Sequence, residues 1–254
     1  MESGLAEIRR APAQRPGLSA VCAVPGPAAG EVSGAAALPV LPALRELLPR
    51  GGLVRGSVVS VAEFGVLALA LLAGASADGA WCAIAGVPEA GILAAAELGL
   101  DPARTLLVPD PGDAWPEVVA SLLDGCELVL LRPPARPPAQ VRRRLEATLR
   151  RGRGVLLVAG DWPGAQLRMR VAAQRWTGLG DGHGRLRACC AEVVADGRGE
   201  AAVTRSRWLW LPAEDGGVAV ADPADIPFGL PGDRPGAVPA LRPGAVPALR
   251  AVSG

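Results

Sequence analysis

Short apolar runs and longer helix-like segments alternate along the chain between residues 38 and 161. The apolar runs predict strands at 57–61, 81–85, 105–108, 128–131 and 154–159. The segments between them predict helices at 64–77, 89–98, 113–123 and 139–150, and the leucines at 41, 44, 47 and 48 predict one more helix before the first strand. Buried strands that alternate with helices are typical of βαβ units. The pattern therefore predicts an α/β fold with a mainly parallel sheet.

Beyond residue 161 the helical pattern ends and three strand-like segments follow. They lie at 168–176, 185–195 and 201–211, separated by Gly-rich turns, and predict antiparallel strands at the C-terminal edge of the sheet. Residues 1–37 lack periodicity and predict a loose N-terminal arm. From residue 212 the chain is rich in Pro and Gly and repeats RPGAVPAL at 234–241 and 242–249. We therefore expect a core at 38–211 and a disordered tail at 212–254.

Composition restricts the chemistry that the chain can carry out. All 26 basic residues are arginines, so any mechanism that needs a lysine is excluded. The net charge of +1 gives no overall preference for acidic partners. Five cysteines without a C-x-x-C pair, and a single histidine, His183, in a Gly-rich turn, argue against a disulfide framework, a zinc site and a catalytic base. The sequence shows neither a secretory signal nor an apolar run long enough for a bilayer, so we expect a cytoplasmic protein.

Three stretches resemble the ATPase core of RecA. GGLVRGSVVSV at 51–61 is similar to the entry into its first core strand, and DGAWCAIAG at 78–86 to its second. AAELGLDPARTLLVPDP at 95–111 looks like the helix and strand that come next. The order of elements agrees from about residue 40 to 195, which implies a RecA-like three-layer core.

Other stretches resemble one group of RecA-like proteins in particular. LPALRELLPRGGLVRGS, GDWPG and GLGDGHGRLR look like the actinobacterial ImuA-type proteins, accessories of a mutagenic DNA-repair cassette. The resemblance implies work in SOS-induced translesion synthesis beside an inactive Y-family polymerase relative of the ImuB type and an error-prone replicative-type polymerase. DNA and RecA are further candidate partners. The alternatives are a SulA-like cell-division inhibitor and a weak NTPase that a partner completes.

The parts of an ATP site are missing from the sequence. A P-loop holds phosphate with a Gly-rich turn, a lysine and a Ser or Thr. Here Ala62, Glu63, Phe64 and Gly65 lead from strand to helix, without lysine or hydroxyl. By the resemblance to RecA, Arg132 stands where the Walker B strand is followed by a Mg²⁺-binding Asp, and Glu89 is out of register with the catalytic Glu. We therefore predict a pseudo-ATPase with no catalytic residue, cofactor or metal.

An arginine-rich segment follows the strand at 128–131. Its candidate nucleic-acid contacts are Arg136, Arg142, Arg143, Arg144, Arg150, Arg151 and Arg153. Val141, Leu145 and Leu149 form the apolar stripe of the predicted helix, so the arginines are expected to face outward. They form either a solvated helix face, with Glu146 bridging Arg142 and Arg150, or a phosphate-binding patch.

Two further segments hold candidate contacts. GDWPGAQLRMR at 160–170 lies where RecA has its second DNA loop, so Trp162 either stacks on a base or lies in a tight turn, while Arg168 and Arg170 meet phosphates. In the tail, Ile226, Phe228 and Leu230 are candidate partner-docking residues. The repeat that follows them fits either a docking arm or a neutral expansion.

Overall fold

The computed structural model describes residues 37–152, 154–178 and 184–222. In this part of the chain the main sheet has nine strands in the order β11-β10-β9-β8-β3-β7-β6-β4-β5. The strands are β3 (Val58–Val61), β4 (Cys82–Ala85), β5 (Thr105–Val108), β6 (Leu128–Leu131), β7 (Val155–Ala159), β8 (Leu167–Trp176), β9 (Cys189–Gly197), β10 (Arg205–Trp210) and β11 (Ala219–Val220). Strands β1 (Ala37–Pro39) and β2 (Gly52–Val54) form a separate antiparallel pair.

The parallel part of the sheet runs from β5 to β8, and the antiparallel part from β8 to β11. Strands β4, β6, β7, β3 and β8 pair in parallel with their neighbours in this part. Strand β9 is antiparallel to both β8 and β10, and β11 is antiparallel to β10. The predicted mainly parallel sheet with antiparallel strands at its C-terminal edge is therefore confirmed, except that β8 itself is parallel to β3.

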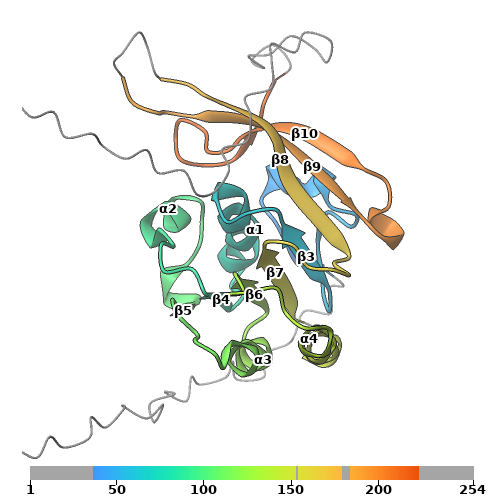
Figure 1. The fold of residues 1–254 in the computed structure, drawn as a ribbon. Coiled ribbons are helices and arrows are strands. Elements are labelled where there is room, and N and C mark those ends of the chain that lie inside the picture. The colour runs from blue at the N-terminus through green and yellow to red at the C-terminus, as the bar shows by residue number, and fades with distance from the viewer. Residues whose placement is uncertain (1–36, 153, 179–183, 223–254) are drawn as a thin grey trace, which may run out of the picture.

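Helices cover both faces of the parallel strands, which makes three layers (Figure 1). The helices are α1 (Val66–Ala77), α2 (Ile92–Glu97), α3 (Trp115–Gly125) and α4 (Ala139–Gly152). Helices α1 and α2 pack on one face, in a cluster with Ile84 and Leu157, while α3 and α4 pack on the other with Val129 and Val158. Strands β3, β4, β6 and β7 thus contribute side chains to both cores, whereas the edge strand β5 contributes only to the second, through Leu106 and Val108.

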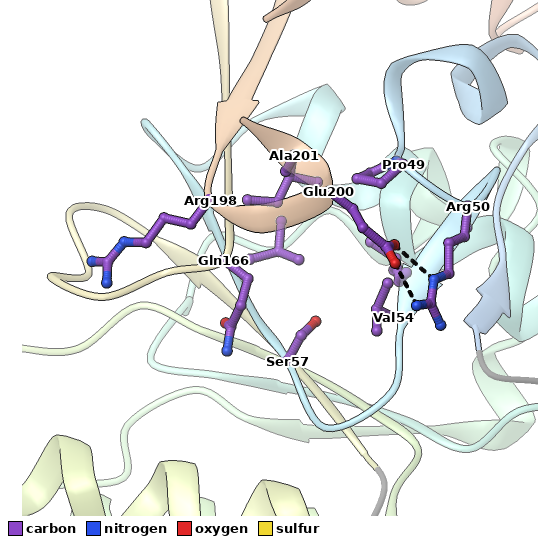
Figure 2. Close-up of a pocket in the computed structure, with 12 residues that line it drawn as sticks. Pro49, Arg50, Val54, Ser57, Gln166, Arg198, Glu200 and Ala201 are labelled. Atoms are coloured by element: carbon purple, nitrogen blue, oxygen red, sulfur yellow. Dashed lines mark hydrogen bonds and ion pairs between the residues drawn. The ribbon is translucent and has the colours of Figure 1, made fainter. Parts of the chain in front are cut away.

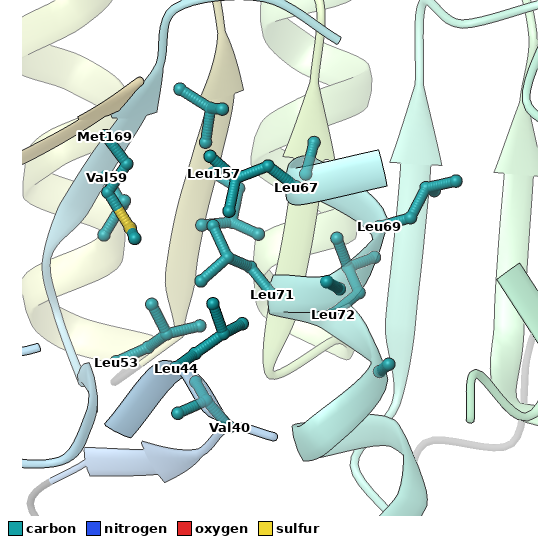
Figure 3. Packing of buried hydrophobic residues seen from close by; sticks show 14 of the residues in the cluster. Val40, Leu44, Leu53, Val59, Leu67, Leu69, Leu71, Leu72, Leu157 and Met169 are labelled. Atoms are coloured by element: carbon teal, nitrogen blue, oxygen red, sulfur yellow. The ribbon is translucent and has the colours of Figure 1, made fainter. Parts of the chain in front are cut away.

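Helix α1 is buried on nearly all sides, because a second layer of chain lies over it. A short 3-10 helix, η1 (Pro42–Leu47), places Leu44 near Leu71 of α1, in the cluster that also contains Leu157 and Met169 of the sheet (Figure 3). The contact is so close that a Cβ atom on Gly74 would lie 2.4 Å from the backbone of Val40. This explains why an apolar helix without a polar face is stable here.

Several boundaries differ from the prediction, which also included neither β1 nor β2. The segment at 41–48 forms η1 rather than an α-helix, since prolines at 39, 42 and 49 leave room for only two turns. Helix α2 begins at Ile92, not at residue 89. The ordered chain also continues past residue 211: a turn at Gly216, with φ of 85°, returns it as β11, which pairs Val220 with Leu209 and buries Ala221. The core therefore extends to Asp222.

Candidate functional site

The carboxyl ends of the parallel strands meet at one edge of the sheet. Strand β4 leads into α2 on one face, whereas the neighbouring β6 leads toward α4 on the other face. Chains that diverge in this way from adjacent parallel strands open the crevice in which α/β proteins usually bind ligands. In this protein Glu89 follows β4 and Arg132 follows β6.

An ion pair between Arg132 and Glu89 spans this crevice. Arg132 Nη2 donates to Glu89 Oε2 at 2.8 Å, Nη1 contacts Oε1, and Nε donates to the Gly86 carbonyl oxygen at 3.1 Å. The guanidinium lowers the pKa of the Glu89 carboxyl, mainly through this hydrogen bond, and Glu89 in turn raises the pKa of Arg132. Arg132, which stands where the resemblance places a Mg²⁺-binding Asp, is thus joined to Glu89, which is out of register with the catalytic Glu of RecA.

Gly86 is required for this arrangement. It has φ of 73°, and a Cβ atom there would lie 2.2 Å from the carbonyl oxygen of Arg132. The backbone N–H of Arg132 also donates to the carbonyl oxygen of Ala85 at 3.0 Å. The loops after β4 and β6 are therefore held together by backbone as well as by charge.

The loop between β3 and α1 offers little to a phosphate. It has only four residues, Ala62 to Gly65, and the N–H of Ala62 already donates to the carbonyl oxygen of Met169 at 2.9 Å. The side chain of Glu63 is exposed and brings negative charge to the loop. Gly65 is extended, with φ of 173°, and its carbonyl accepts the first bond of α1 from Leu69.

The arginines of α4 divide into paired and unpaired groups. Arg144 contacts Glu117 of α3 at 2.9 Å, and Arg136, ahead of the helix, lies 3.7 Å from Asp161. Arg142 is half-buried, with Nη1 3.5 Å from the Pro137 carbonyl oxygen, and Arg151 donates to Thr148 Oγ1 at 3.3 Å. Arg143 and Arg150 are exposed and form no ion pair with any carboxylate in the described part of the chain.

The structure places Arg168 and Arg170 on the same side of the sheet as α4. Leu167 and Met169 of β8 point into the core beneath α1, so the two alternating arginines point to the opposite face. Both are exposed, and neither pairs with a described carboxylate. The arginines at 136–151 and at 168–170, which were predicted as two separate groups of contacts, therefore lie on the same side of the sheet.

The interpretation of Trp162 as a base-stacking residue is wrong. Its side chain is completely buried in the cluster beneath α3 and α4, where the chain crosses over β3 from β7 to β8. Its indole Nε1 donates to Glu146 Oε1 at 3.2 Å. The Glu146 carboxylate therefore accepts a hydrogen bond from Trp162, and the predicted ion-pair bridge from Glu146 to Arg142 and Arg150 is not formed. The alternative reading, a tryptophan in a tight turn, is correct.

Several predicted residues lie outside the described part of the chain. These are Arg153, the histidine His183 and the docking candidates Ile226, Phe228 and Leu230. Sequence reasoning also missed two residues, Trp208 and Trp210, which lie half-buried on the side of β10 that faces away from the core of Leu209. The alternation in RSRWLW at 205–210 would have placed both on one face of a strand.

A small pocket lies at the amino ends of β3 and β8, opposite the crevice. Its volume is about 200 Å³, and Ser57, Leu167 and Ala201 are among the residues that line it. Figure 2 shows Arg50 and Glu200 joined at its rim, by hydrogen bonds of 2.6 and 2.7 Å, while Arg198 points away. Since ligand pockets usually measure about 300–1,000 Å³, we assign no ligand to it.

The cysteines of the described chain are buried and unreactive in character. Burial raises the pKa of Cys82 to about 12 and those of Cys126 and Cys189 to about 11. Among residues 37–152, 154–178 and 184–222, no three His, Cys, Asp or Glu side chains gather in a group that could hold a metal ion. No helix of the same residues has the length and apolar character that a bilayer span needs.

Comparison with known proteins places one domain on the core of this fold. Residues 46–164 match the model of the MT3502 N-terminal domain. They include the crevice with Glu89 and Arg132, and all of α4. The match ends before β8, so it leaves the antiparallel strands outside.

A second comparison found a relative in Mycobacterium tuberculosis (strain ATCC 25618 / H37Rv). The chain is 37% identical over 128 residues to the uncharacterized protein Rv3395c. The aligned part covers 49% of this chain and 63% of the mycobacterial protein. The chain therefore spans less than two thirds of the length of that relative.

Proposed function

We propose that this chain is a non-catalytic, RecA-like accessory protein of SOS-induced translesion synthesis. As an adaptor of the actinobacterial ImuA type, it binds an ImuB-type Y-family polymerase relative and an error-prone replicative-type polymerase in the cytoplasm. DNA and RecA are its further candidate partners.

The ion pair between Arg132 and Glu89 carries the non-catalytic part of the proposal. An ATPase needs a carboxylate after the Walker B strand to hold Mg²⁺, and a carboxylate free to orient water. In this chain the first position is a guanidinium, which repels Mg²⁺ and neutralises the Glu89 carboxylate opposite it. The four-residue loop at 62–65, with Glu63, adds repulsion toward a triphosphate.

The comparisons and the fold are compatible with the adaptor part. The sheet order, the layers and the mycobacterial relative agree with what an actinobacterial ImuA-type protein implies. The chain keeps a full hydrophobic core on both faces of the sheet although the nucleotide loop is reduced. Such a scaffold retains surfaces for partners while it lacks the residues for phosphoryl transfer.

Two measurements test the proposal. Titration calorimetry with ATP and Mg²⁺ should give no binding heat; a micromolar dissociation constant would contradict the non-catalytic reading. The chain, tagged and recovered from cells after DNA damage, should carry both polymerases with it, and a matched untagged strain serves as control. Recovery of cell-division proteins without polymerases would favour the SulA-like alternative instead.

A further inference from the structure

Beyond β3, one face of the sheet has no helix over it in the described chain. Helices α3 and α4 pack on the parallel strands, and the crossover that carries Trp162 covers β3 (Figure 1). Strands β8, β9 and β10 extend past this layer. Their other face is buried beneath α1 and η1, through residues such as Met169, Val193 and Leu209. We call this side of β8–β10, over which no described helix lies, the strand platform.

Two indole rings lie on the strand platform. Trp208 and Trp210 alternate with the buried Leu209, so both project to the platform side, about 7 Å apart along β10 at the usual strand rise. Trp208 is opposite Glu192 and Trp210 opposite Cys190 of β9. Both rings are only half-buried, although large aromatic side chains usually reach the core or an interface.

Arginines lie on the same side of these strands, along β8 and just after β9. Arg168, Arg170 and Arg175 of β8 share the platform, because their β9 partners Asp196, Val194 and Cys190 face the same side. Arg198 follows β9 and reaches the crossover, since its Nη2 would lie 3.9 Å from a Cβ atom on Gly164.

Cations outnumber carboxylates on the strand platform. The four arginines are exposed, whereas its two carboxylates, Glu192 and Asp196, are half-buried. Arg168, Arg170 and Arg198 form no ion pair with a carboxylate of the described chain. Guanidinium groups of this kind remain available to a negatively charged ligand.

We propose that the strand platform binds single-stranded DNA, with Trp208 and Trp210 stacking on bases and Arg168, Arg170 and Arg198 contacting phosphates. Aromatic rings beside exposed cations match the two components of a single strand, its base faces and its backbone. A duplex keeps its base faces stacked inside and offers only phosphate. This inference rests on the proposed function in taking DNA as the molecule on which the partners act, but it does not depend on the partners themselves.

The test is fluorescence anisotropy of the whole chain with a labelled oligothymidylate and with a duplex of the same length. The single strand should bind more tightly. The double variant Trp208→Ala/Trp210→Ala should lose about tenfold or more in affinity, because each stacked base is lost. Its dependence on salt should stay unchanged, since the arginines remain, whereas Arg168→Ala/Arg170→Ala should lower the salt slope.

A matched control separates stacking from loss of structure. Trp176, which is 39% exposed, lies opposite Cys189 on the other face of the same strands, so Trp176→Ala should bind as the wild type does. If the double Ala variant unfolds, Trp208→Phe/Trp210→Phe keeps aromatic rings and should retain most of the affinity. Equal affinity for single strand and duplex, or equal loss in the Trp176 variant, would overturn the inference. Recovery of the polymerases by the double variant is scored separately and tests the adaptor proposal alone.

Discussion

At the scale of single residues, burial decides the role of the most conspicuous aromatic side chain. Trp162 fills the space over β3 and satisfies its N–H with Glu146. We predict that Trp162→Ala destabilises the protein by about 3–5 kcal/mol, because it leaves a large cavity and an unpaired acceptor. Urea unfolding measures this. The exposed Trp176→Ala serves as control and should change stability by less than about 0.5 kcal/mol; equal effects would contradict the burial argument.

The Arg132–Glu89 ion pair makes stability depend on pH. Because the pKa of Glu89 is lowered in the fold, its contribution is present at neutral pH and is lost as pH falls through the lowered value. The melting temperature of Glu89→Gln should therefore lie below that of the wild type at pH 7, and the two should converge below about pH 4, the ordinary carboxyl range. Because the pair is half-exposed, 1 M salt should also reduce the difference at pH 7. A difference that persists in acid would contradict this account.

At this scale the sequence predicted features that depend on residue identity alone, and it missed features that depend on a contact between distant residues. The absence of lysine and the presence of Arg132 after the strand can be read directly from the chain. The partner of Arg132 could not be, because Glu89 is 43 residues away and meets it only when β4 and β6 pair. The burial of Trp162 likewise depends on a crossover over β3 that no local pattern specifies.

At the scale of elements, hydrophobic periodicity predicted β5 and β6 to the residue and the other core strands to within a few positions. It worked because each buried strand is apolar on both faces and each helix has its own period. It failed at η1, where prolines limit the helix, and at β11, since two residues carry no period. The stripe of Val141, Leu145 and Leu149 also predicted correctly that most arginines of α4 face outward.

Helix α4 gives a prediction at the same scale. Arg143 and Arg150 lie seven residues apart on its outer side and form no ion pair with a described carboxylate, whereas Arg144 already pairs with Glu117. If this side contributes to DNA binding, Arg143→Ala/Arg150→Ala should lower the slope of log affinity against log salt by about 1.4, or about 0.7 for each phosphate contact. The control Arg144→Ala should lower it less. An unchanged slope in the double variant would assign these arginines to a solvated helix face.

At the scale of the whole molecule, the fold brings residues that are distant in the sequence to the same side of the sheet. The arginines of α4, those of β8 and the tryptophans of β10 lie on one side of the sheet, although they span residues 142 to 210. No local pattern could predict this, because the side on which a helix packs depends on the handedness and order of the connections. The crevice and the strand platform therefore result from the topology of the sheet. The sequence shows which residues they contain, but it does not show that these residues lie together.

The extent of the folded unit leads to the last prediction. Strand β11 covers the outer edge of β10, and Ala221 is buried after it, so a chain that ends at Leu211 would expose the edge and the side chains beneath it. Truncation after Leu211 should lower the melting temperature by several degrees, at about 2–4 °C for each kcal/mol lost in a chain of this size. Truncation after Asp222 removes only residues beyond the described fold and should leave the melting temperature nearly unchanged. Calorimetry of the two truncated chains beside the full chain makes the comparison. If both truncations were equally harmless, β11 would add nothing to the core; if both were equally harmful, the fold would need residues beyond Asp222, and the docking candidates Ile226, Phe228 and Leu230 would have to be reconsidered as part of the core.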